Sequence, residues 1–129
     1  MLEKLVAQFE AASADYAENN GMLRDPDWFL LKLQEEMGEL TQAWNRATGR
    51  GRKKGRTEED LARDLADETA DLLGHILLFA RDNGIDLASA IERKWRFRPD
   101  AEQVSPRREN PAALRGGPSE RRGGRCIPL

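Results

Sequence analysis

The stretch Lys32-Leu-Gln-Glu-Glu-Met-Gly-Glu-Leu-Thr-Gln-Ala-Trp44 decides the fold, because its apolar residues recur at the spacing of an amphipathic helix. Glu36 and Glu39 within it are spaced i, i+3, so both carboxylates project from one side of that helix. Glu68 and Asp71 repeat this spacing in a second helical stretch. No segment alternates apolar and polar residues as a strand would. The sequence therefore predicts an all-α fold, an antiparallel bundle of about four helices.

Start and stop signals bound the four helices. Asp25 followed by Pro26 is a strong N-terminal signal, and Asn83-Gly84 is a typical C-terminal one. The predicted helices run from about Leu2 to Asn19, Pro26 to Thr48, Thr57 to Asn83, and Asp86 to Phe97. We expect the inward faces of the second and third helices to consist of Leu30, Leu33, Met37, Leu40, Trp44 and Ala47, and of Leu61, Leu65, Leu72, Ile76 and Phe79.

Composition divides the 129 residues into a body and a tail. Five of the six prolines lie at or after Pro99, so residues 1–98 are predicted to form one helical domain and residues 99–129 an irregular Pro/Gly/Arg-rich tail. The net charge of −2 gives no global footprint for nucleic acid, so nucleic acid is not expected as a partner. The single cysteine, Cys126, favours a reducing compartment, and no apolar run approaches the ~20 residues of a membrane helix. We expect a cytoplasmic protein with no membrane partner.

The two acidic pairs should meet across a helical hairpin. A short basic loop, residues 49–56, joins the second and third helices, so these helices should be antiparallel neighbours. Glu39 lies nine residues before Thr48, and Glu68 lies eleven residues after Thr57. In the same way, Glu36 lies twelve residues before Thr48, and Asp71 lies fourteen after Thr57. At about 1.5 Å of rise per residue, each cross-helix pair differs in height by only ~3 Å.

These carboxylates predict a magnesium site. Glu68 falls inside the apolar stripe of its helix, where an isolated carboxylate would cost several kcal/mol. A bound cation would offset that cost, as would an Arg or Lys partner or protonation. Magnesium prefers oxygen ligands, whereas zinc and di-iron sites need more His or Cys than the lone His75 and Cys126. Solvated acids that happen to align remain an alternative.

The run 32–44, followed by Asp67-Glu-Thr-Ala-Asp-Leu-Leu-Gly-His75, resembles the MazG-like family of all-α nucleoside triphosphate pyrophosphohydrolases. That family carries E-E-x-x-E on one helix and E-x-x-D on a later one. The resemblance implies hydrolysis of a nucleoside triphosphate to the monophosphate and pyrophosphate by homodimers or homotetramers. It further implies that the Mg²⁺ ligands and catalytic residues are Glu36, Glu39, Glu68 and Asp71. Lys94 matches a basic position on the family's last helix, and Lys32, one turn before Glu36, could also bind substrate.

Other functions fit parts of the same pattern. The stretch 68–75 also resembles phosphoribosyl-ATP pyrophosphohydrolase of histidine synthesis. A non-enzymatic helical interaction protein would use the apolar faces, and a nucleic-acid-binding helper would use the loop and the tail. Apolar residues off the predicted stripes, such as Phe29, Leu31 and Leu73, indicate a subunit interface and hence a homodimer or homotetramer.

Overall fold

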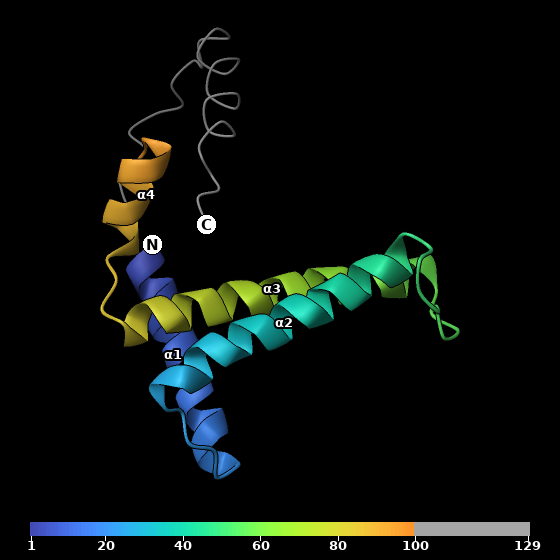
Figure 1. The fold of residues 1–129 in the computed structure, drawn as a ribbon, viewed down its shortest axis with the longest axis horizontal. Helices are drawn as coiled ribbons and strands as arrows, with labels where there is room; N and C mark the ends of the chain where they lie inside the picture. Colours follow the sequence, from blue (N-terminus) through green and yellow to red (C-terminus); the bar gives the residue numbers. More distant parts are fainter. Residues whose placement is uncertain (100–129) are drawn as a thin grey trace, which may run out of the picture. The chain divides into compact units, whose positions relative to one another are not determined.

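The computed structural model describes residues 1–99, and these residues are helical with no strand. The helices are α1 (Leu2–Asn19), α2 (Pro26–Ala47), α3 (Glu58–Asp82) and α4 (Leu87–Trp95), as Figure 1 shows. The all-α prediction is confirmed, with each helix end within two residues of its expected position. The predicted tail lies almost wholly outside the described residues, so the division between residues 98 and 99 stays a prediction.

The chain forms two compact units, which meet in the sequence at Leu87 and Ala88. The first unit contains α1, α2 and α3. Its α2 and α3 run antiparallel and make the most extensive helix contact, while α1 packs against α3 (Figure 1). The described part of the second unit is α4 from Ala88 onward and the residues up to Pro99. No helix within residues 1–99 has the length and apolar composition needed to cross a membrane.

Side-chain caps fix the starts of the two hairpin helices. At α2, the Asp25 carboxylate accepts a hydrogen bond from the backbone N–H of Trp28 at 2.8 Å. At α3, the Thr57 hydroxyl accepts from the Asp60 N–H at 3.1 Å, and the Asp60 carboxylate accepts from the Thr57 N–H at 3.0 Å. Both starting points were predicted, and they set the level at which the acids of one helix face those of the other.

Glu10 of α1 links the three helices of the first unit. Its carboxylate accepts two hydrogen bonds of 2.9 Å from the Arg24 guanidinium, which also lies over the Phe29 ring at 5.3 Å. Arg81 of α3 approaches the same carboxylate at 3.6 Å. Arg24 immediately precedes the cap of α2, so this cluster fixes the entry of α2 relative to α1 and α3.

The prediction of which face of α2 points inward is wrong for three residues. Leu30, Met37 and Trp44 are 55%, 51% and 51% exposed, whereas the residues one position earlier, Phe29, Glu36 and Ala43, are buried. On α3, Ile76 is likewise exposed, while its neighbours Leu77 and Leu78 are buried. Both sets on α2 have the same seven-residue spacing, so periodicity cannot distinguish them. The set Phe29, Glu36 and Ala43 is less hydrophobic than the set Leu30, Met37 and Trp44, and it is nevertheless the buried one.

Candidate metal centre

Three glutamates from two helices converge in the first unit. One carboxylate oxygen from each of Glu36, Glu39 and Glu68 lies within 4.8 Å of the others. Glu36 and Glu39 come from adjacent turns of α2, and Glu68 comes from α3. Their meeting follows from the capped starts and antiparallel direction of the two helices. The expectation that these acids lie level across the hairpin is confirmed for this group, which we call the glutamate cluster.

Two oxygens of the glutamate cluster are buried without a hydrogen-bond partner. Glu36 is only 6% exposed, and it is the one charged residue among the buried side chains of residues 1–99. Its Oε2 atom and the Oε2 atom of Glu68 both lack a donor. An unsatisfied buried carboxylate oxygen is costly. A ligand that supplies positive charge or hydrogen-bond donors at this point would remove that cost.

The two basic groups near Glu36 approach its Oε1 atom and not the unpartnered Oε2 atom. Lys32 Nζ lies 3.7 Å from Glu36 Oε1, and His75 Nε2 lies 3.6 Å from the same atom. Lys32 also donates a hydrogen bond to the exposed Glu35 at 3.2 Å. The alternative in which an Arg or Lys neutralises the acids therefore applies to one side of Glu36 only, since Oε2 remains unpartnered.

Burial and like charge disfavour ionisation within the cluster. Burial, followed by the neighbouring Glu39 and Asp71 carboxylates, raises the pKa of Glu36 to about 7, despite the opposing charge of Lys32. Burial also raises the pKa of Glu68, and Glu39 and Asp71 again add to the effect. A divalent cation would reverse this balance, because it stabilises the ionised form of every carboxylate that it contacts.

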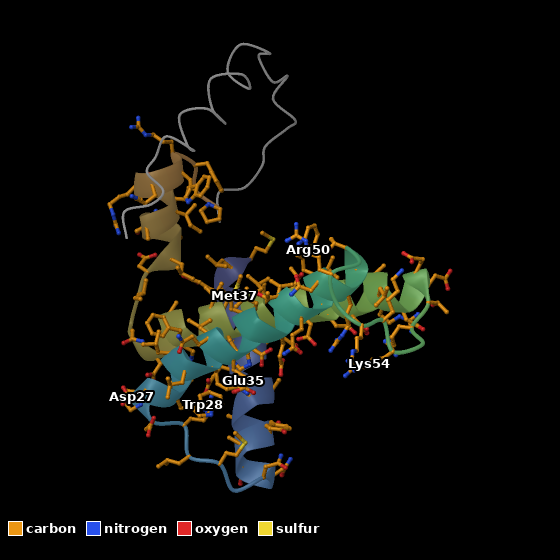
Figure 2. All side chains as sticks on the ribbon, turned by 45° about the vertical axis from the view of Figure 1, so that its right-hand side comes forward. Asp27, Trp28, Glu35, Met37, Arg50 and Lys54 are labelled. Carbon is orange, nitrogen blue, oxygen red and sulfur yellow. The ribbon has the colours of Figure 1, made fainter. Side chains whose placement is uncertain are left out.

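His75 and Trp28 border the cluster beside Lys32. The rings of Trp28 and His75 meet edge to face with centroids 6.0 Å apart, and Lys32 Nζ lies 6.0 Å from the Trp28 ring centre. Burial, with the nearby charge of Lys32, lowers the pKa of His75, which favours a neutral imidazole at pH 7. Figure 2 shows Trp28 and Glu35 along one edge of α2 and Met37 along the other. The i, i+4, i+8 spacing of Trp28, Lys32 and Glu36 places these three side chains on one face of α2.

The remaining predicted site residues lie elsewhere. Asp71 is exposed and is not one of the three converging groups, although its charge raises the pKa of Glu36 and Glu68. Lys94 is exposed in the last turn of α4, in the second unit. The assigned roles of both residues stay predictions.

The basic loop is partly held by acids at the start of α3. Arg56 makes a two-pronged contact with Asp64, with N–O distances of 2.5 and 3.1 Å. Lys53 lies 3.3 Å from Glu58. These contacts give Arg56 and Lys53 partners within the protein, at the junction of the loop and α3.

The cluster suits a hard divalent cation. Its converging donors are carboxylate oxygens, with neither a thiol nor a second imidazole nearby among the described residues. Magnesium takes such oxygens, whereas structural zinc sites use Cys and His. Comparisons with protein-family models, with curated proteins and with solved structures found no match for this chain.

Proposed function

We propose that this protein hydrolyses a nucleoside triphosphate to the monophosphate and pyrophosphate in a Mg²⁺-dependent reaction. The observation that carries the proposal is the pair of buried, unpartnered oxygens on Glu36 and Glu68, within a cluster of three converging carboxylates. The choice of a triphosphate substrate rests on the MazG-like resemblance of residues 32–44 and 67–75. Removal of unwanted nucleotides or control of the nucleotide pool would be the cellular role, in the cytoplasm.

The proposed roles follow from the position of each group. Glu36, Glu39 and Glu68 would hold Mg²⁺, with Asp71 at the exposed rim of the cluster. Bound Mg²⁺ would offset the negative charge of the phosphate oxygens. The less buried acids, Glu39 or Asp71, would accept the proton of the attacking water. The positive charge of Lys32, which Glu35 and Glu36 now balance, would contact the negative oxygens of the triphosphate. Lys94 is the second proposed substrate contact.

The proposed assembly is a homodimer or homotetramer. Leu30, Met37 and Trp44 form a half-exposed row on α2, and Leu73 and Ile76 are 47% and 41% exposed on α3. Rows of large apolar side chains on both helices of one hairpin are costly in water. A second copy of the same hairpin would cover them, so no different protein is needed to bury these apolar side chains.

A screen of ordinary and modified nucleoside triphosphates with Mg²⁺ tests the function. We expect release of pyrophosphate and a monophosphate, loss of that release in Glu68→Gln, and its retention in Asp67→Asn. Asp67 is the matched control because it is the exposed neighbour of Glu68. Equal activity of wild type and Glu68→Gln would remove the proposed role of Glu68. Activity confined to phosphoribosyl-ATP would favour the histidine-synthesis alternative, and no hydrolysis of any triphosphate would favour a non-enzymatic interaction protein.

A further inference from the structure

Charge is distributed very unevenly between the two units of the chain. Residues 1–87 carry 18 Asp and Glu residues against 11 Lys and Arg, whereas residues 88–129 carry ten Lys and Arg against five acids. The net charge of −2 for the whole protein conceals this asymmetry. A basic segment attached to an acidic body is typical of chains that bind a polyanion.

The described part of the basic unit presents cations and aromatic rings in alternation. The sequence Arg93-Lys-Trp-Arg-Phe-Arg98, which we call the basic–aromatic segment, closes α4 and continues beyond it. All six residues are exposed, with Trp95 at 45% and Phe97 at 51%. Glu92 precedes this segment in the sequence and accepts a 2.6 Å hydrogen bond from Arg98, and Asp100 follows the segment two residues after Arg98. The three further cations, Arg93, Lys94 and Arg96, outnumber these two flanking acids.

Arg96 adopts a backbone conformation that glycine usually supplies. Its φ of +67° lies in the left-handed region, and its N–H donates to the Glu92 carbonyl at 3.0 Å as the helix ends. A glycine would end α4 there with less strain. The helix therefore ends between the two aromatic residues of the segment, Trp95 and Phe97.

We propose that the basic–aromatic segment binds single-stranded nucleic acid. Unpaired bases would stack on Trp95 and Phe97, and the cations of Arg93, Lys94 and Arg96 would contact the phosphates between them. Surfaces that hold single strands without sequence preference combine these two features, because every base has a flat face and every linkage a charge. A membrane surface is the less suited polyanion, since each exposed ring here has a cation on both sides in the sequence.

The test measures binding of fluorescein-labelled dT15 and U15 to the full chain in EDTA, so that the glutamate cluster plays no part. We expect micromolar affinity that weakens with salt, with a log–log slope of about −2 for three contacted phosphates. Trp95→Ala should weaken binding about tenfold, and Trp95→Tyr should largely restore it. The double variant Arg93→Gln, Arg96→Gln should make the slope shallower by about 1.4, because two phosphate contacts are lost. Tyr16→Ala, which removes an exposed ring from α1, should leave binding unchanged.

Four results would overturn the proposal. The first is equal affinity for a 15-base-pair duplex or for dextran sulfate, because neither offers unpaired bases to the rings. The second is undiminished binding by Trp95→Ala with a helical circular dichroism spectrum like that of wild type. The third is loss of binding in the double variant Lys53→Gln, Lys54→Gln, which would assign the activity to the loop. The fourth is binding to phosphatidylserine vesicles but not to the oligonucleotides.

Discussion

Glu36 of α2 and Glu68 of α3 hold carboxylate oxygens within 4.8 Å of each other, and the Oε2 atom of each is buried without a hydrogen-bond partner. Helix packing alone brings these like groups together, since the hairpin starts are capped and its helices run antiparallel. The folded protein therefore contains a local electrostatic cost when both groups are ionised. Every prediction about the site follows from the ways in which that cost can be removed.

Substitution of Glu36 by Gln should stabilise the metal-free protein. At pH 8 in EDTA, wild-type Glu36 is ionised against its raised pKa of about 7, and Gln removes the charge while keeping the shape. We expect the free energy of unfolding to rise by about 1–3 kcal/mol, from roughly 1.4 kcal/mol per unit of pKa. Urea denaturation measures this. A marked loss of stability in Glu36→Gln would show that Lys32 already compensates the charge.

The stabilising effect of Glu36→Gln should depend on pH. A carboxyl whose pKa is about 7 when folded and 4.5 when unfolded loses its favourable contribution as pH rises from about 4.5 through 7. The difference in stability between the variant and wild type should therefore be smallest near pH 5 and level off above pH 7.5. Taking this difference largely cancels the opposing pH dependence of His75, whose pKa is lowered. A difference that shrinks from pH 5 to pH 8 would contradict the burial of an ionisable Glu36.

Substitution of Lys32 by Met should affect substrate binding more than turnover. The Met side chain retains the apolar stem beside Trp28 but removes the ammonium that lies 3.7 Å from Glu36. If this cation binds phosphate, KM for the triphosphate should rise about fivefold to tenfold, with a smaller change in kcat. Lys4→Met, an exposed cation on α1, is the control. An unchanged KM in Lys32→Met would leave Lys32 as a partner of Glu35 and Glu36 only.

Two glycine-to-alanine changes should act in opposite directions. A Cβ atom at Gly74 of α3 would lie 2.6 Å from Cε1 of the Phe9 ring, so Gly74→Ala should destabilise the α1–α3 contact by about 1–3 kcal/mol. A Cβ atom at Gly38 of α2 would meet nothing within 4 Å, so Gly38→Ala should stabilise the protein by about 0.5–1 kcal/mol. Thermal unfolding of both variants measures this. Equal effects would mean that α1 does not pack on α3 through Phe9.

Substitution of Met37 by Glu should disrupt the proposed homo-oligomer. Met37 lies in the middle of the exposed apolar row on α2, where a second copy would bury the new charge without a partner. Light scattering at micromolar concentration should show a dimer or tetramer for wild type and a smaller species for Met37→Glu. Leu23→Glu provides the control, since Leu23 is 82% exposed between α1 and α2. A monomeric wild type would refute the assembly.

Much of the fold was predictable because its signals are local. The Asp25-Pro26 start, the Thr57 cap and the Asn83-Gly84 end each depend on neighbouring residues, and each lies where it was expected. The meeting of Glu39 with Glu68 also followed, because antiparallel pairing and helical rise place them level, whereas the structure brings Glu36 rather than Asp71 into the same group.

The orientation of each helix about its own axis was not predictable to one residue. Residues 29, 36 and 43 and residues 30, 37 and 44 are equally periodic, and the folded structure buries the first set. The ring of Trp28 against His75 depends on the same choice, so the sequence did not indicate it. Long-range packing, rather than local propensity, decided these features.

A titration of the protein with Mg²⁺ at pH 8, followed by calorimetry, tests the glutamate cluster most directly. We predict saturable binding to wild type, at least tenfold weaker binding to Glu36→Gln and Glu68→Gln, and unchanged binding to Asp67→Asn. Equal Mg²⁺ affinity in all four proteins, or no binding to any of them, would contradict the assignment of these buried oxygens to a cation.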